Sequence, residues 1–286
     1  MSRHPSGLPE PLVQLDRPIV MGVLNVTPDS FSDGGRHFEL TSAIAHGIKM
    51  QHEGADVIDV GGESTRPGAT RIDVHEELHR VLPVVTALVT AGVYVSIDTM
   101  RSEVARQCVM AGACIVNDVS GGLADQDMYA MVAQLDVPYV IMHWRGHGAV
   151  MNSLASYSDV SAEVISEINE RLVAATAAGV NRDAIIIDPG LGFAKESADN
   201  WQVLKHLAGF VDLGYPVLIG ASRKRFLGSL LAGSTGVPRD FAGRDAATDA
   251  VSAIAAATGV WGVRVHNVQS TVDAVLVGQA WARGRQ

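Results

Sequence analysis

The sequence has few of the features that mark secreted, membrane-spanning or nucleic-acid-binding proteins. Only two cysteines are present, Cys108 and Cys114, so no disulfide framework is expected and a reducing cytoplasm is the predicted compartment. The first residues, MSRHPSGLPEP, lack the apolar segment of a signal peptide, and no apolar run is long enough to span a membrane. A net charge of −9 argues against a nucleic-acid partner, because phosphate backbones need clustered Lys and Arg. It leaves room for small anions, which need only a local set of donors.

What the sequence does contain is a repeated alternation of short apolar runs and helical patterns over 286 residues. The eight runs are rich in β-branched residues and lack strict polar alternation, which is typical of parallel strands buried on both faces. They span residues 18–25, 55–62, 93–98, 114–118, 138–143, 184–189, 216–222 and 262–266.

A stretch with helical spacing of apolar residues follows each run. Eight strand–helix units in succession favour an α/β fold that is a single closed (β/α)8 barrel, the TIM barrel, over a doubly wound open sheet. No change of composition marks a second domain, so residues 18–286 are predicted to form the barrel. Residues 1–17 are predicted to be an N-terminal tail that is frayed over its first dozen residues.

Nearly every predicted strand ends in a polar or ionisable residue. The residues at these ends are Asn25, Glu63, Asp98, Asn117, Asp118, His143, Asp188, Ser222 and His266. The carboxyl ends of barrel strands share one face, where barrel enzymes build their active sites. Turn formation and helix capping explain one or two such residues, but not a nearly complete ring. The sequence therefore predicts a polar site on that face.

Three strand ends carry side chains that accept hydrogen bonds, namely Asp98, Asn117 and Asp188. Together in one pocket, they would hold a heterocycle that carries several N–H donors. The alternative is that each caps a local turn, which is most credible for Asp118, because Asn117 precedes it.

Positively charged residues follow other strands on the same face. In the motif GGESTRPG, Arg66 offers a two-pronged donor for carboxylate or phosphate. The motif GASRKRF brings Arg223, Lys224 and Arg225 to the start of a short helix, a suitable place for an anion. The alternatives are a Gly-rich surface turn and a solvated basic turn.

The last predicted strand, VRVH, places Arg264 and His266 two residues apart, so their side chains lie on one face. If that face is the barrel interior, the arginine needs an anionic partner. An ion pair confined to the core is equally compatible with this stretch.

The motif HEELH, residues 75–79, matches the zinc-protease pattern H-E-x-x-H. The apolar residues of the surrounding helical pattern lie on another side of the helix than His75, Glu76 and His79. We therefore expect a solvated helical face here rather than a zinc site.

Eight motifs, in this order, together resemble the dihydropteroate synthase family. They are MGVLNVTPDSFSDGG, DVGGESTRPGA, SIDT, NDVSGG, MHWRG, DPGLGFAK, GASRKRFLG and VRVH. The likeness is greatest to bacterial, and especially actinobacterial, members. It implies a TIM-barrel transferase that joins 6-hydroxymethyl-7,8-dihydropterin diphosphate to p-aminobenzoate, giving 7,8-dihydropteroate and pyrophosphate for folate biosynthesis. It also implies Mg²⁺ as cofactor, competition by sulfonamides and a homodimer.

The resemblance implies roles for individual residues. The expected pterin contacts are Asp98, Asn117, Val119, Met142, Asp188, Lys224 and Arg264. The expected diphosphate contacts are Asn25, Arg264 and His266, with Asn25 also on Mg²⁺. The expected p-aminobenzoate contacts are Thr65, Arg66, Pro67, Phe193 and Arg225. Because Arg225 replaces the serine of many members, the carboxylate is expected to use a backbone N–H or the helix N-terminus there.

The implied mechanism is dissociative, of the SN1 type. Mg²⁺ and cationic groups stabilise the departing pyrophosphate, and a pterin methylene cation remains. The first loop then closes to exclude water, with Asp33 near the cation and Phe31 beside the aminobenzoate. The residues expected to be catalytic are Phe31, Asp33, Lys224, Arg264 and His266.

Two other functions stay open at this point. One is a pterin-binding methyltransferase barrel, which needs neither the first loop nor the STRP and SRK motifs. The other is a non-catalytic paralogue that binds pterin without turnover. The segment 145–158 is expected to be a flexible loop and has no assigned role.

Overall fold

Eight parallel strands form a barrel in the computed structural model, which describes residues 4–27, 36–64, 71–147 and 151–284. The strands are β1 (Ile19–Asn25), β2 (Val57–Gly61), β3 (Val95–Asp98), β4 (Ile115–Asp118), β5 (Tyr139–Met142), β6 (Ile185–Asp188), β7 (Leu218–Ile219) and β8 (Gly262–Val265). Pairing follows the chain from β1 to β6, and β1 also pairs with β8, which pairs with β7. A bridge between Ile187 and Val217 joins the two remaining edges. The predicted barrel is confirmed, and the open doubly wound alternative is wrong.

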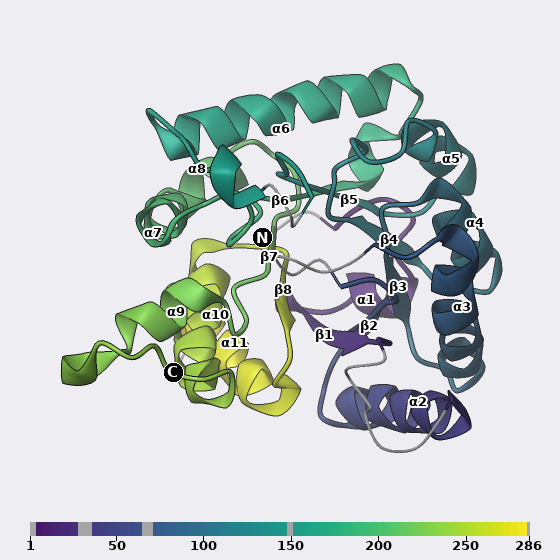
Figure 1. Cartoon of the computed structure of the whole chain (residues 1–286), viewed down its shortest axis with the longest axis horizontal. Helices are drawn as coiled ribbons and strands as arrows, with labels where there is room; N and C mark the ends of the chain where they lie inside the picture. Colours follow the sequence, from purple (N-terminus) through teal and green to yellow (C-terminus); the bar gives the residue numbers. More distant parts are fainter. Residues whose placement is uncertain (1–3, 28–35, 65–70, 148–150, 285–286) are drawn as a thin grey trace.

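Helices follow the strands and cover the outside of the barrel (Figure 1). The α-helices in the described residues are α1 (Glu10–Val13), α2 (Arg36–His52), α3 (Val74–Thr90), α4 (Ser102–Met110), α5 (Met128–Leu135), α6 (Val160–Ala177), α7 (Ser197–Lys205), α8 (Leu207–Val211), α9 (Arg225–Leu230), α10 (Asp245–Thr258) and α11 (Val268–Arg283). In Figure 1, α3 and α4 lie on one side of the strands and α9, α10 and α11 on the other, with α6 across the top.

The strand register sets the polar strand ends level with one another. Asn25 pairs with Gly61, and Gly61 pairs with Asp98. Asp98 in turn pairs with Asn117 on β4. These residues form a row at the carboxyl ends of four adjacent strands, so the predicted polar face is confirmed there.

Apolar side chains fill both sides of the strands, as their lack of alternation predicts. One cluster lies between the strands and the helices and includes Val20, Ile58 and Leu88. A smaller cluster, near the amino-terminal ends of the strands, includes Met21 and Trp261. The polar carboxyl-end face is thereby built on a packed apolar base.

Residues 4–17 pack against this smaller cluster, so the fraying predicted for the first dozen residues is wrong for residues 4–12. Leu8 and Leu12 are buried within the cluster, and Arg17 binds Asp56 through two hydrogen bonds of 2.6 and 2.8 Å. The Pro, Ser and Gly content of the segment suggested a mobile chain. Burial of a leucine side chain, worth about 2 kcal/mol, outweighs that tendency.

Both cysteines are free thiols in buried or half-buried positions. Burial raises the pKa of Cys108 to about 12 and that of Cys114 to about 11, which keeps both groups protonated. Within the part of the chain that the structure describes, no helix combines the length and the apolar character needed to cross a bilayer.

Candidate active site

An arginine held between two carboxylates forms the centre of the site. Arg264 Nε lies 2.6 Å from Asp59 Oδ2, and its Nη2 lies 2.6 Å from Asp98 Oδ2. Asp59 Oδ2 also accepts a hydrogen bond of 2.9 Å from Asn117 Nδ2. Strands β2, β3, β4 and β8 thus supply one connected network. The core ion pair that was expected as an alternative for Arg264 is present, and it joins two predicted site residues.

The strand-end pattern does not select Asp59, because this residue lies in the middle of β2. A carboxylate inside the apolar run VIDVG is nevertheless a signal, since burying a charge without a partner is costly. Asp59 is fully buried, and its Oδ1 has no hydrogen-bond partner among the described residues.

Asp188 and Lys224 are held together by a tight turn after β6. Asp188 Oδ1 accepts a hydrogen bond of 2.7 Å from the N–H of Gly190, and Lys224 Nζ donates to the carbonyl of Leu191. Gly190 has a φ of 68°, and a Cβ on it would lie 2.3 Å from the carbonyl oxygen of His143. Only glycine fits this turn, which explains the DPG sequence.

Burial changes the ionisation of three site residues. It raises the pKa of Asp98 to about 7, although the charge of Arg264 acts in the opposite direction. It also raises the pKa of Asp188, and Lys224 opposes this shift. The pKa of Lys224 falls to about 8 because burial outweighs the charge of Asp188. Desolvated groups with specific charge partners are typical of functional sites.

An apolar cluster borders these charged groups. Val119 and Met142 are buried in it, and Trp144 and Phe193 pack against it. Lys224 Nζ lies 4.5 Å from the centre of the Phe193 ring, within the range of a cation–π contact. The structure thus gathers three residues that were predicted to line the site. Trp144, two residues after the end of β5, was not predicted.

Asn25 is the last residue of β1, and His266 follows the neighbouring strand β8. Ser222 fixes the histidine, since its Oγ lies 2.9 Å from His266 Nδ1 and accepts the His266 N–H at 3.1 Å. Asn25 and His266, two of the three predicted diphosphate residues, therefore lie on the carboxyl-end face. The strand-end pattern includes Ser222 but assigns it no role.

The predicted cluster of three cations after β7 is wrong. Arg223 forms two hydrogen bonds, of 2.7 and 2.8 Å, with Asp245 at the start of α10, so its charge is already neutralised. Arg225 is exposed as the first residue of α9. Lys224 is the member of the three that lies beside Asp188 and Phe193.

Asp118 is a local cap, as its alternative interpretation expected. Its Oδ1 accepts from the N–H and the hydroxyl of Ser120 at 2.8 and 2.6 Å. Its Oδ2 accepts from Gly122 N–H at 2.7 Å and from the Tyr139 hydroxyl at 2.8 Å. Asp118 therefore stabilises the turn after β4, whereas its neighbour Asn117 belongs to the site network.

The HEELH motif lies in the first turns of α3. His75 and His79 are exposed and Glu76 is partly exposed, so the expected solvated face is confirmed. Glu77 faces the other way, is buried, and pairs with Arg101. No group of three His, Cys, Asp or Glu placed to hold a metal ion occurs within the described ranges.

Several predicted site residues lie outside the described part of the chain. They are Phe31, Asp33, Thr65, Arg66 and Pro67. Arg101 bridges the two described segments on either side of residues 65–70. Its Nη2 donates to Glu63 Oε2 at 2.8 Å and to the carbonyl of Ile72.

A second buried network lies behind the turn after β6. Lys195 Nζ lies 2.9 Å from His143 Nδ1, and His143 Nε2 lies 3.0 Å from Glu167 Oε2. Burial, reinforced by the charge of Lys224, lowers the pKa of Lys195 to about 7. Burial and the charge of Lys195 lower the pKa of His143 to about 4. The strand-end pattern includes His143 but misses Lys195 and Glu167.

The low pKa of His143 predicts an acid-sensitive fold. Between pH 6.5 and about 4 the unfolded chain binds a proton at His143 that the folded chain does not, so the free energy of unfolding falls as the pH falls. The loss approaches about 3 kcal/mol, since one pKa unit is worth about 1.4 kcal/mol. Urea unfolding across this pH range should show the slope, and His143→Gln should flatten it.

The matched control is His79→Gln on the exposed face of α3, which should keep the wild-type slope. A His143→Gln variant with an unchanged slope would contradict the assignment.

The fold and the site together define a class of protein. A (β/α)8 barrel with buried acceptors, cations and an apolar wall at the carboxyl ends of its strands has the features of an enzyme that binds a flat, polar ring.

Comparison with known proteins specifies the family. The family model described as pterin-binding enzyme matches residues 21–266. The dihydropteroate synthase of Mycobacterium leprae is 53% identical over 263 residues, which cover 92% of this chain and 93% of that protein. The Xanthomonas albilineans dihydropteroate synthase with 4-aminobenzoic acid has a TM-score of 0.84 and 47% identity, over 93% of both chains. The Yersinia pestis enzyme in a sulfonamide complex has a TM-score of 0.88 and 38% identity, over 99% of this chain and 100% of that chain.

The chain belongs to the pterin-binding enzymes and, among them, to the dihydropteroate synthases, which are transferases.

Proposed function

We propose that the chain condenses 6-hydroxymethyl-7,8-dihydropterin diphosphate with p-aminobenzoate, releasing pyrophosphate and forming 7,8-dihydropteroate. The observation that carries this proposal is the set of buried hydrogen-bonding groups around Arg264. Asp98, Asn117 and Asp188 come from three different strands, and all lie at the same face of the barrel. The relatives named above are dihydropteroate synthases, and the structure of one of them contains 4-aminobenzoic acid.

A pterin ring matches these groups in its hydrogen bonding. The amino-pyrimidinone edge carries N–H donors for the carboxylate of Asp188 and a carbonyl for the ammonium of Lys224. The unpartnered Oδ1 of Asp59 offers one more acceptor. Val119 and Met142 supply the apolar surface beside the flat ring. A ring that satisfies these buried groups gains both affinity and orientation.

The diphosphate is assigned to Asn25, Arg264 and His266, which come from β1 and the end of β8. Mg²⁺ fits here as an ion carried by the substrate, because it retains most of its waters and binds phosphate oxygens with few protein ligands. The amide oxygen of Asn25 would hold it, and the described residues offer no all-protein cage. When bound, Mg²⁺ neutralises charge that develops on the departing pyrophosphate.

We propose a dissociative reaction. Arg264 and His266 bind and orient the diphosphate, so that charge developing on the leaving group is stabilised. The C–O bond to the diphosphate breaks, and the positive charge spreads over the pterin methylene group. The amine of p-aminobenzoate then attacks this carbon and loses its proton. The apolar cluster around Phe193 limits the access of water to the cation.

The deciding experiment measures pyrophosphate release and dihydropteroate formation together. We expect both products only when pterin diphosphate, p-aminobenzoate and Mg²⁺ are all present. Removal of Mg²⁺ with a chelator should reduce the rate to background, and excess Mg²⁺ should restore it. Tight pterin binding with neither product would instead identify a non-catalytic paralogue or another pterin enzyme. Sulfonamides should raise the apparent KM for p-aminobenzoate without changing kcat.

We also propose a homodimer formed through α10 and α11. These packed helices expose Ile254, Val277 and Trp281, the last with 85% of its surface accessible, and exposed apolar groups of this size are typical of interfaces. Light scattering should give twice the chain mass. Val277→Lys combined with Trp281→Lys should give a monomer, whereas Val173→Lys on α6, at a residue equally exposed, should leave the dimer intact. A wild-type monomer would contradict the proposal.

A further inference from the structure

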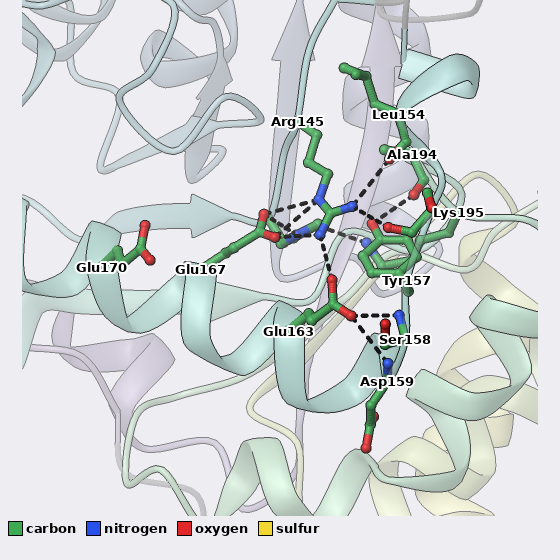
Figure 2. A network of polar contacts seen from close by, with 12 residues as sticks. Arg145, Leu154, Tyr157, Ser158, Asp159, Glu163, Glu167, Glu170, Ala194 and Lys195 are labelled. Carbon is green, nitrogen blue, oxygen red and sulfur yellow. Dashed lines mark hydrogen bonds and ion pairs between the residues drawn. The ribbon is translucent and has the colours of Figure 1, made fainter.

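A closed circuit of side chains links the segment after β5 to the turn after β6 (Figure 2). It starts at Lys195, which is buried and donates three hydrogen bonds. Its Nζ lies 2.9 Å from His143 Nδ1, 3.1 Å from the Gly190 carbonyl and 3.2 Å from the Phe193 carbonyl. In its protonated form, Lys195 has three N–H donors, one for each of these three acceptors. The lysine thereby holds both ends of the turn 190–193.

The protons in this circuit can be assigned from its geometry. Because Lys195 donates to Nδ1, His143 is neutral and carries its proton on Nε2, which points at Glu167 Oε2 at 3.0 Å. Glu167 therefore remains a carboxylate, and the low pKa of His143 agrees with this assignment. Lys195 lacks a direct carboxylate partner in the described residues, and its charge is balanced through the imidazole.

Arg145 carries the circuit onward from Glu167. It binds both oxygens of this carboxylate and also Glu163. Its Nη1 donates to the carbonyls of Leu154 and Ser156 at 3.2 and 2.9 Å. One guanidinium thus fixes the end of the segment 145–158, which had no role assigned from its sequence.

Tyr157 closes the circuit. The Arg145 guanidinium lies 3.9 Å from the centre of its ring, and the Tyr157 hydroxyl donates to the Ala194 carbonyl at 2.7 Å. Ala194 has a φ of 45°, which is unfavourable for a residue with a side chain. Held between Tyr157 and Lys195, this residue keeps a conformation that an unsupported loop would leave.

The turn that the circuit holds includes Phe193, whose carbonyl accepts from Lys195. The Phe193 ring packs against the apolar cluster and lies beside Lys224. A buried lysine is a costly way to fill space, and a methionine would fill it more cheaply. What Lys195 provides in addition is the fixed position of two carbonyls, and with them the direction in which Phe193 points.

We infer that Lys195 is a positioning residue for the aromatic amine substrate, and that His143, Glu167, Arg145 and Tyr157 hold it in place. This inference rests on the proposed function, since it deepens the assignment of Phe193 to p-aminobenzoate. Lys195 does not touch the substrate. It sets the orientation of the Phe193 ring, so its loss weakens the binding of p-aminobenzoate more than that of the pterin.

The test compares Lys195→Met and Tyr157→Phe with Lys205→Met, an exposed lysine on α7. Each variant is assayed for kcat and for KM of both substrates. Lys195→Met should raise KM for p-aminobenzoate about tenfold, the value of roughly one hydrogen bond to a charged group. KM for pterin diphosphate should change less than about twofold. Tyr157→Phe should shift KM for p-aminobenzoate in the same direction by about threefold, and Lys205→Met should match wild type.

Two results would overturn the inference. One is an unchanged KM for p-aminobenzoate in both test variants. The other is an equal rise of KM for both substrates, which would indicate a general structural role. If Lys195→Met fails to fold, Tyr157→Phe decides, because it removes a single hydroxyl from a half-buried ring. A wild-type chain that forms no dihydropteroate would refute the proposed function itself, and this outcome is visible before any variant is made.

Discussion

Arg264→Met is expected to lower kcat/KM for dihydropteroate formation by about three orders of magnitude. The substitution removes the cation assigned to the diphosphate. It also leaves Asp59 and Asp98 buried without the guanidinium that now lies 2.6 Å from each. Loss of one partner from a buried ion pair destabilises a fold by about 3–5 kcal/mol. Steady-state kinetics and urea unfolding should show both effects.

A second variant separates these two effects. Adding Asp59→Asn to Arg264→Met removes one orphaned charge while keeping an acceptor for Asn117. We expect the double variant to regain part of the lost stability but none of the lost activity. If the double variant regained turnover as well as stability, Arg264 would contribute to activity only by stabilising the fold.

Asp188→Asn is expected to weaken the binding of a pterin by about 100-fold. The carboxylate is buried and is proposed to accept two N–H donors of the ring, and a hydrogen bond to a charged group is worth about 1.5–3 kcal/mol. An asparagine keeps the oxygen that accepts from Gly190 N–H, so the turn is expected to survive. Calorimetric titration with a pterin should measure the change directly.

Asp212→Asn, at an exposed residue after α8, is the matched control and should bind the pterin as wild type does. Binding by Asp188→Asn that equals wild type would remove Asp188 from the pterin site.

The barrel and one face of its site were predictable because they depend on local signals. Strands buried on both faces give apolar runs without alternation, and a polar residue that ends such a run marks the carboxyl face. Asp98, Asn117 and Asp188 were found in this way, and the register of the strands sets Asp98 level with Asn117. Likewise, the outward direction of His75 followed from helical spacing alone.

The residues that the sequence failed to reveal depend on distant partners. Asp59 lies inside a strand, and its role appears only when Arg264 reaches it from another strand. Lys195 has no local feature that distinguishes it from a surface lysine, and its burial follows from His143 on β5. Arg223 is the opposite case: it was predicted to belong to an anion site, but Asp245 neutralises its charge. In each case the decisive contact joins elements that are far apart in the chain.

The pairing of β1 with β8 also determines at which stage of synthesis the active site can form. Asp59 and Arg264 are 205 residues apart, so they meet only after the last strand has left the ribosome. Until that moment β1 has a free edge, and buried carboxylates of β2 and β3 lack their cation. Contacts between such distant residues form slowly, and open strand edges attract other chains. A nascent or truncated copy without β8 therefore lacks the cation of the Asp59–Asp98 network and leaves the edge of β1 open to pairing with other chains.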